Sequence, residues 1–74
     1  MTSEQIIRKV LRSNAFHDEG EENGIRWFIT GVESDAPHVL YGITSEAVLF
    51  SDDDGAEASE CESQSFNAFC KEAF

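Results

Sequence analysis

Basic residues are scarce in this sequence. Lys and Arg together number 5 against 15 Asp and Glu, which gives a formal net charge of −10 at pH 7. Because DNA and RNA binding depends on cations that neutralise phosphates, this balance argues against direct binding of nucleic acid. It also argues against binding to an anionic membrane surface. The charge instead favours a basic protein surface as partner, whose approach would be steered electrostatically and weakened by salt.

Long apolar runs are also missing. No stretch approaches the ~20 residues that a membrane-spanning helix needs, and no leader pattern stands at the N-terminus, so we expect a cytoplasmic protein. The two cysteines, Cys61 and Cys70, fit neither a CxxC redox motif nor a dense disulfide framework. We therefore expect two free thiols, with Cys61 on a strand and Cys70 in the core.

Motifs that carry catalysis or calcium binding are absent. The sequence contains no GxSxG, P-loop, GxGxxG or HExxH. A calcium loop with Gly55 at position six would need ligands at Phe50 and Cys61, which cannot supply them. A loop with Gly20 at position six would begin at Ala15 and fails in the same way.

A zinc site and a catalytic pocket are equally unsupported. His17, His38, Cys61 and Cys70 lack the close paired spacing that brings zinc ligands together. A domain of 74 residues also leaves little room for a pocket that could shift the pKa of an acid. We therefore expect no enzymatic activity, no cofactor and no metal.

The apolar residues gather in the middle of the chain. Three segments, IRWFITGV, HVLYGIT and AVLF, follow one another between Ile25 and Phe50. Their side chains alternate with the period of two that is typical of strands, although neither face is polar throughout. We expect a turn from Glu33 to Pro37. We therefore expect a β-meander of three antiparallel strands.

Helical patterns flank the meander on both sides. The stretch from Thr2 to Arg12 has an apolar stripe at helical spacing, and Thr2 and Gln5 have the form of a capping box. Its basic residues either form a patch or complement the dipole of the helix. The stretch from Ser65 to Phe74 places its aromatic residues on one face, which we expect in the core.

The remaining segments are acidic. His17 to Gly24 predicts a glycine-punctuated loop, whereas Ala56 to Glu62, after an Asp54-Gly55 turn, would suit a strand at the sheet edge. The expected fold is a single α+β domain over residues 1–74, two-layered, in the order helix, three- to four-stranded antiparallel meander, helix.

Two short helices could leave one sheet face open. Apolar side chains such as Phe28 or Phe50 would then be partly exposed and available to a homodimer or another partner. Alternatively, the helices could take opposite faces, or loops could fold over the open one.

Ten of the acidic residues fall in two short stretches. Along an extended strand, alternate side chains such as Glu60 and Glu62 stand ~6.6 to 6.8 Å apart, comparable to successive phosphates of a nucleic-acid strand. Such acids could occupy a groove lined with Lys and Arg, or they could simply keep the surface solvated. The candidate partner-binding residues are Asp18, Glu19, Glu21, Glu22, Asp52, Asp53, Asp54, Glu57, Glu60 and Glu62.

In small size, strong acidity and lack of catalytic motifs, the whole chain resembles the phage-encoded anti-CRISPR and anti-restriction inhibitors of the nucleic-acid-mimic type. The resemblance is one of general character and carries no individual residue over. It implies a stoichiometric inhibitor that docks on the nucleic-acid-binding surface of a nuclease or CRISPR surveillance complex, in the cytoplasm of a bacterial host. The competing hypothesis is a small structural or interaction module, such as a homodimer, that binds through apolar sheet surface while the acids maintain solubility.

Overall fold

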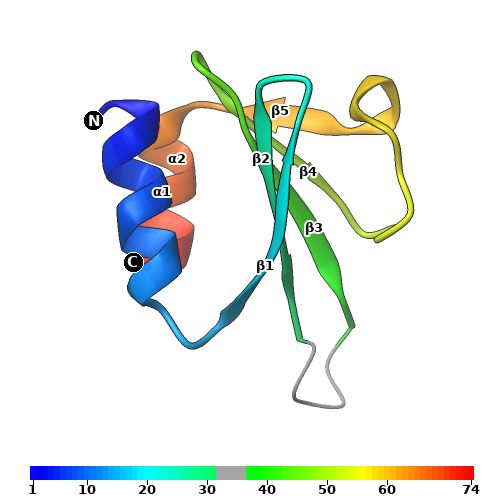
Figure 1. Ribbon diagram of the computed structural model, residues 1–74, viewed down its shortest axis with the longest axis horizontal. Helices are drawn as coiled ribbons and strands as arrows, with labels where there is room; N and C mark the ends of the chain where they lie inside the picture. The colour runs from blue at the N-terminus through cyan, green and yellow to red at the C-terminus, as the bar shows by residue number, and fades with distance from the viewer. Residues whose placement is uncertain (32–36) are drawn as a thin grey trace.

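One antiparallel sheet and two helices account for most of the chain. The computed structural model describes residues 1–31 and 37–74, so the predicted turn at 33–37 lies, apart from Pro37, outside the described residues. Within them the elements are α1 (Ser3–Arg12), β1 (Phe16–Glu22), β2 (Ile25–Thr30), β3 (Val39–Ile43), β4 (Val48–Ser51), the 3-10 turn η1 (Ala58–Glu60), β5 (Glu62–Gln64) and α2 (Phe66–Ala73) (Figure 1). The α+β class and the helix, sheet, helix order are as expected.

The sheet is larger than predicted because the first acidic segment is a strand. Among the described residues it has five strands in the order β1-β2-β3-β4-β5, each paired with the next along the chain. The prediction of a loop from His17 to Gly24 is wrong: β1 pairs with β2 from Phe16 opposite Thr30 to Glu22 opposite Ile25. Asn23 and Gly24 between them have φ of 54° and 79°, the left-handed values that a two-residue hairpin turn requires.

The predicted edge strand from Ala56 to Glu62 is displaced along the chain. Residues 56–61 form a loop and η1, and only Glu62–Gln64 pairs with β4. Cys61 therefore ends η1 instead of lying on a strand. Its thiol and that of Cys70 are free, as expected. Both are half-buried, and Cys70 packs against the core without belonging to its fully buried cluster.

The helix boundaries follow local capping signals. The Thr2 amide donates to Gln5 Oε1 at 2.9 Å and the Gln5 amide donates to Thr2 Oγ1 at 3.3 Å, which confirms the capping box. Ser65 caps α2 by accepting from the Ala68 amide at 3.1 Å. Neither helix of the described chain has the length and apolar character needed to cross a membrane.

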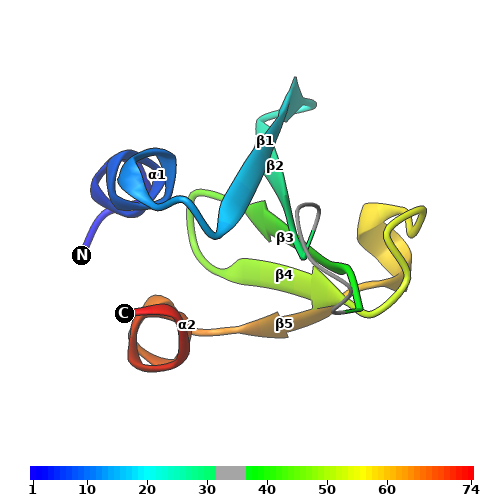
Figure 2. The ribbon, with the colours of Figure 1, turned by 90° about the horizontal axis from the view of Figure 1, so that it is seen from below.

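Both helices pack on the same face of the sheet (Figure 2). The core consists of side chains that are at most 1% exposed, from both helices and the three central strands: Ile6, Val10, Phe28, Ile43, Val48 and Phe69. Phe28, which the open-face alternative named as partly exposed, is therefore a core residue. Phe50, whose partner across the sheet is Tyr41, remains half-buried on the same face.

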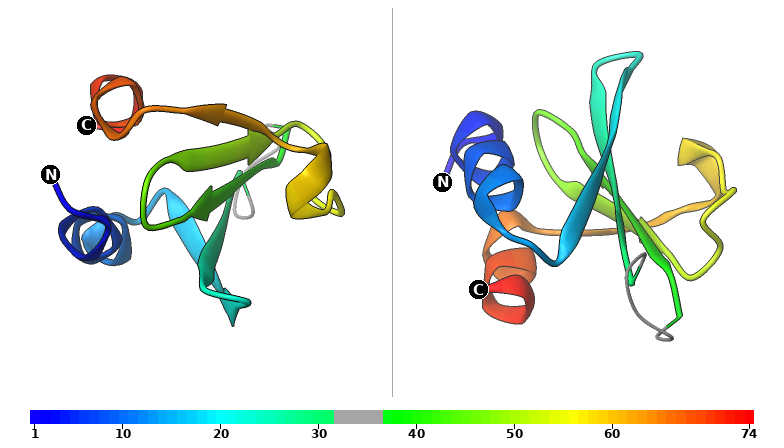
Figure 3. Two further views of the ribbon diagram at one scale, coloured as in Figure 1. Left: turned by 90° about the horizontal axis from the view of Figure 1, so that it is seen from above. Right: turned by 60° about the horizontal axis from the view of Figure 1, so that its bottom comes forward.

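The opposite face is covered by the chain itself. The segment that contains η1 lies across the sheet from the two helices, as both views in Figure 3 show. On this face Ile29 is 8% and Leu40 is 5% exposed. Of the alternatives that the sequence left open, the structure thus has loops folded over the open face, and this arrangement creates the candidate site.

Candidate functional site

The site is organised around the only tryptophan of the chain. Trp27 on β2 faces away from the helices, because its neighbour Phe28 points into the core. Across the sheet it stands opposite Gly42 on β3. A Cβ atom at Gly42 would lie 2.5 Å from Trp27 Cζ3 and 2.8 Å from Cε3, so the indole ring rests directly on the glycine backbone. This close approach fixes the position of the ring.

Two acidic walls border the ring. The β1–β2 hairpin contributes Glu19, Glu22 and Asn23 on one side, and residues 54–59 form the other. The floor is apolar and consists of Ile25, Trp27, Ile29 and Leu40. We call the depression that these residues line the Trp27 groove.

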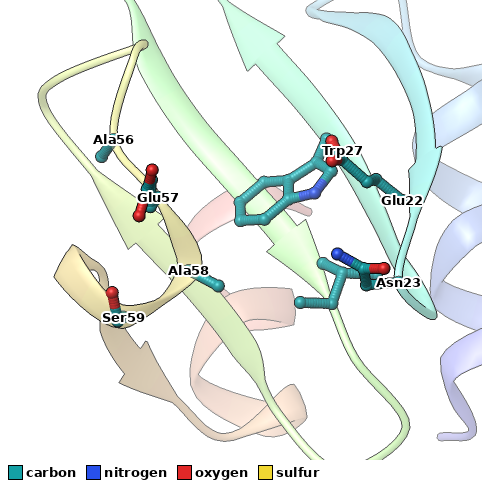
Figure 4. Close-up of a pocket in the computed structure, with 8 residues that line it drawn as sticks. Glu22, Asn23, Trp27, Ala56, Glu57, Ala58 and Ser59 are labelled. Carbon is teal, nitrogen blue, oxygen red and sulfur yellow. The ribbon is translucent and has the colours of Figure 1, made fainter.

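The Trp27 groove is open and sizeable. Its larger part has a volume of about 670 Å³ and its smaller part about 220 Å³. In Figure 4 the indole extends into the space between Glu57 and Ala58 on one side and Glu22 and Asn23 on the other. Even so small a domain therefore has a sizeable open depression, because the loop after β4 lies over the sheet.

Side chains within the loop hold its shape. Ser51 Oγ accepts from the Asp53 amide at 3.1 Å, and Asp53 Oδ1 accepts from the Gly55 amide at 2.9 Å. Further along, the Glu57 amide donates to Glu60 Oε1 at 2.9 Å. Asp53 and Glu60 therefore stabilise the loop, and replacing either would change its structure as well as its charge.

The structure divides the ten candidate acids among three places. Four of them, drawn from both acidic stretches, border the Trp27 groove: Glu19, Glu22, Asp54 and Glu57. Four line a separate cleft of about 430 Å³ together with Phe50 and Ser51: Asp52, Asp53, Glu60 and Glu62. The other two lie beside Arg26, on the helix side of the hairpin: Asp18 and Glu21.

The predicted ridge of evenly spaced carboxylates is not formed. Glu60 lies in η1 and Glu62 on β5, so they are not alternate residues of one extended strand. Glu62 also stands opposite Phe50, on the helix side of the sheet, whereas the Trp27 groove is on the other side. The two acidic stretches share a face only where the β1–β2 hairpin meets residues 54–59.

Asp18 is held by its own chain. Arg26 Nε donates to Asp18 Oδ1 at 3.0 Å, and the Gly20 amide donates to the same oxygen at 2.9 Å. The hydrogen bond from Arg26, with that from Gly20, holds the pKa of Asp18 below its ordinary value. Arg26 is correspondingly engaged, and Asp18 is not available to a partner without breaking this pair.

Negative charge in the Trp27 groove is only partly balanced. Among the described residues, no Lys or Arg lines it. At its margin His17 Nε2 lies 3.5 Å from Glu19 Oε2, and His38 Nδ1 lies 3.2 Å from Asp54 Oδ2. Glu22 and Glu57, which flank the indole in Figure 4, belong to neither of these two pairs.

Metal and thiol chemistry find little support in the described chain. Within it no three His, Cys, Asp or Glu side chains come together as a metal site would require. Burial, followed by the charges of Glu60 and Asp53, raises the pKa of the Cys61 thiol. A raised pKa disfavours the thiolate and so the nucleophile.

Sequence reasoning identified the groove acids but missed Trp27 and Gly42. The alternation in IRWFITGV placed Trp27 with Ile25 and Ile29 on one face. The sequence did not say which face the helices cover. Family models, curated proteins and solved structures give no match to this chain. Function is therefore inferred from the chemistry of the groove.

Proposed function

We propose that this protein is a non-catalytic binding module that docks through the acidic walls of the Trp27 groove onto a basic protein surface of the kind that binds nucleic acid. By occupying that surface it keeps DNA or RNA away. A nuclease or CRISPR surveillance complex of a bacterial host is the partner we put forward. The observation that carries the proposal is the meeting of the two acidic stretches around one groove.

The gathering of like charges supports this proposal. Four carboxylates line the groove, and none of its described lining residues is Lys or Arg. Carboxylates crowded at one place repel each other, and a cleft lined by one sign of charge concentrates the field that attracts the opposite sign. A basic partner reduces the repulsion between the carboxylates and is attracted by their field. An uncharged partner does neither.

An apolar interaction module is the second candidate. It is favoured by Trp27 and Ile25, which stay half-buried in the groove, and by three side chains that are each 51% exposed near the helices: Met1, Leu11 and Phe74. However, a stable dimer buries about 800 Å² on each partner. Residues 54–59 already cover much of the sheet face that such a dimer would use.

The test compares two double variants with the same net charge. Glu22→Gln/Glu57→Gln neutralises both acids beside the indole, whereas Glu4→Gln/Glu46→Gln neutralises two exposed acids outside the groove. Each variant and the natural protein serve as bait in lysates of bacteria that carry CRISPR and restriction systems, and bound proteins are identified by mass spectrometry. We expect a nucleic-acid-binding complex on the natural protein and on the control variant, but not on the groove variant.

Two properties of the captured complex decide between the candidates. A complex held by charge is released by competing duplex DNA and by raising salt from ~50 to ~500 mM, because the Debye length shrinks over this range. A partner that survives high salt and binds the groove variant equally well would contradict the proposal and favour the apolar module.

A further inference from the structure

The Trp27 groove combines a half-buried aromatic ring with carboxylates on both sides. We infer that it receives one arginine side chain of the partner, with the guanidinium over the Trp27 indole and its N–H groups donating to Glu22 and Glu57. The inference rests on the proposed function and names the residue type through which the partner is anchored.

The ring is positioned to receive a ligand. Its six-membered ring lies against Gly42, where even a methyl group would collide with it at 2.5 Å. The groove above has a volume of about 670 Å³ and is lined by the hairpin and by residues 56–59. A fixed ring loses little conformational freedom on binding, which is the advantage of a preorganised site.

The chemistry of the lining selects a cation. Tryptophan is the side chain whose face attracts cations most strongly. An apolar side chain in the same place would remove water from Glu22 and Glu57 without giving them a hydrogen-bond partner, which is costly. Arginine suits the site better than lysine, because its planar group stacks on an indole while its fork of donors reaches carboxylates.

The described cations of the chain itself are used elsewhere. Arg26 is bound to Asp18 and lies over the Phe28 ring at 5.9 Å. Lys9 lies over the Phe74 ring at 5.3 Å, on the helix side of the molecule. The remaining basic residues belong to α1 and α2, across the sheet from the groove: Arg8, Arg12 and Lys71. The charge complementarity of the groove is therefore directed outward.

The test uses the single tryptophan as a reporter. The indole N–H of Trp27 gives one NMR signal, which is followed at low salt during titration with a short arginine peptide. A lysine peptide and a citrulline peptide of the same length are the comparisons, since citrulline has the shape of arginine without its charge. We expect the arginine peptide to shift the indole signal and to bind about 2- to 5-fold more tightly than the lysine peptide. The citrulline peptide should leave the indole signal in place.

Two variants locate the interaction. Trp27→Leu should remove the preference for arginine over lysine, and Glu22→Gln/Glu57→Gln should weaken both peptides. The control Glu4→Gln/Glu46→Gln should bind like the natural protein. The dispersion of the amide spectrum shows whether each variant is folded; if Trp27→Leu is not, the indole shift in the natural protein remains decisive.

The outcomes separate this inference from the proposed function. If the arginine peptide shifts the amides of Glu22 and Glu57 but not the indole, the arginine anchor is wrong and the acidic docking face stands. Equal binding of the arginine and lysine peptides, with equal indole shifts, also overturns the arginine assignment. If neither cationic peptide shifts any signal around the groove at low salt, both the inference and the proposed function fail.

Discussion

Replacing Gly42 by alanine should displace the Trp27 ring from its place. The new Cβ would lie 2.5 Å from Trp27 Cζ3, 2.8 Å from Cε3 and 2.9 Å from Ile25 Cγ2. Such distances are not tolerated between carbon atoms, so the indole must leave its place. Gly42 is buried in the middle of β3, which limits how far the backbone can yield.

The expected cost follows from two opposing effects. Overpacking a filled site costs about 1–3 kcal/mol, whereas replacing glycine by alanine restricts the unfolded chain and returns about 0.4–1 kcal/mol. We therefore expect Gly42→Ala to lower the free energy of unfolding by roughly 1–2 kcal/mol, and to lower Tm by roughly 6–13 °C in a domain of this size.

The assay combines thermal unfolding with fluorescence. Because Trp27 is the only tryptophan, displacement of its ring toward water should move the emission of the folded protein to longer wavelength. Gly55→Ala is the matched control: its Cβ would meet nothing closer than Asp53 Oδ1, at an ordinary 3.5 Å, so its stability should be unchanged or slightly higher.

A double-mutant cycle then assigns the cause. In a Trp27→Val background, Gly42→Ala should cost less, because the main clash is gone while the contact with Ile25 remains. If Gly42→Ala has the stability and emission of the natural protein, or costs the same without the indole, the ring does not rest on Gly42. The description of the Trp27 ring as part of the groove floor would then be wrong.

Two further predictions concern titration. Asp18→Asn keeps an acceptor for the Gly20 amide but loses the charge beside Arg26, so it should cost about 0.2–1 kcal/mol near neutral pH. Since the folded-state pKa of Asp18 is lowered, this contribution to stability is present above the unfolded-state pKa and is lost as pH falls through the folded-state pKa. The unfolding free energies of the variant and the natural protein, measured in urea, should therefore converge in acid. A gap that stays constant with pH would contradict the ion pair. Burial, followed by the charges of Glu72 and Asp52, raises the pKa of Tyr41, the only tyrosine. Tyrosinate absorbance should therefore appear at a pH above the ordinary pKa of tyrosine. The contribution of Tyr41 to stability is lost as pH rises through its folded-state pKa. Titration at the ordinary pKa would show that the phenol is not buried.

Local chemistry explains which elements were predictable. The Thr2 capping box and the apolar stripe define α1 without reference to the rest of the chain. The alternation from Ile25 onward defines β2, β3 and β4. By contrast β1 was missed, because its exposed face is acidic and only Phe16 among its residues is large and apolar. The signal that identifies it is the Asn23-Gly24 pair, the strongest short-range indication of a hairpin.

The candidate site was predictable only as a set of charges. The sequence shows that acids cluster at 18–22 and 52–62, but not that Asp18 is bound to Arg26 or that Asp53 and Glu60 hold a loop in place. These bonds depend on strand pairing and on turn geometry that composition does not specify. Because of these bonds, reversing the charge of Asp53 or Glu60 would alter the loop itself.

The sequence by itself determined the α+β class, the order of helices around an antiparallel meander and the strongly acidic surface, because these follow from periodicity, capping and composition. Tertiary structure alone decided which face of the sheet became the core. Each face of β2 carries a large aromatic side chain, so either Phe28 or Trp27 could have met the helices, and packing buried Phe28. That choice left Trp27 on the far side, where a glycine on the next strand and two acidic segments distant in sequence surround it.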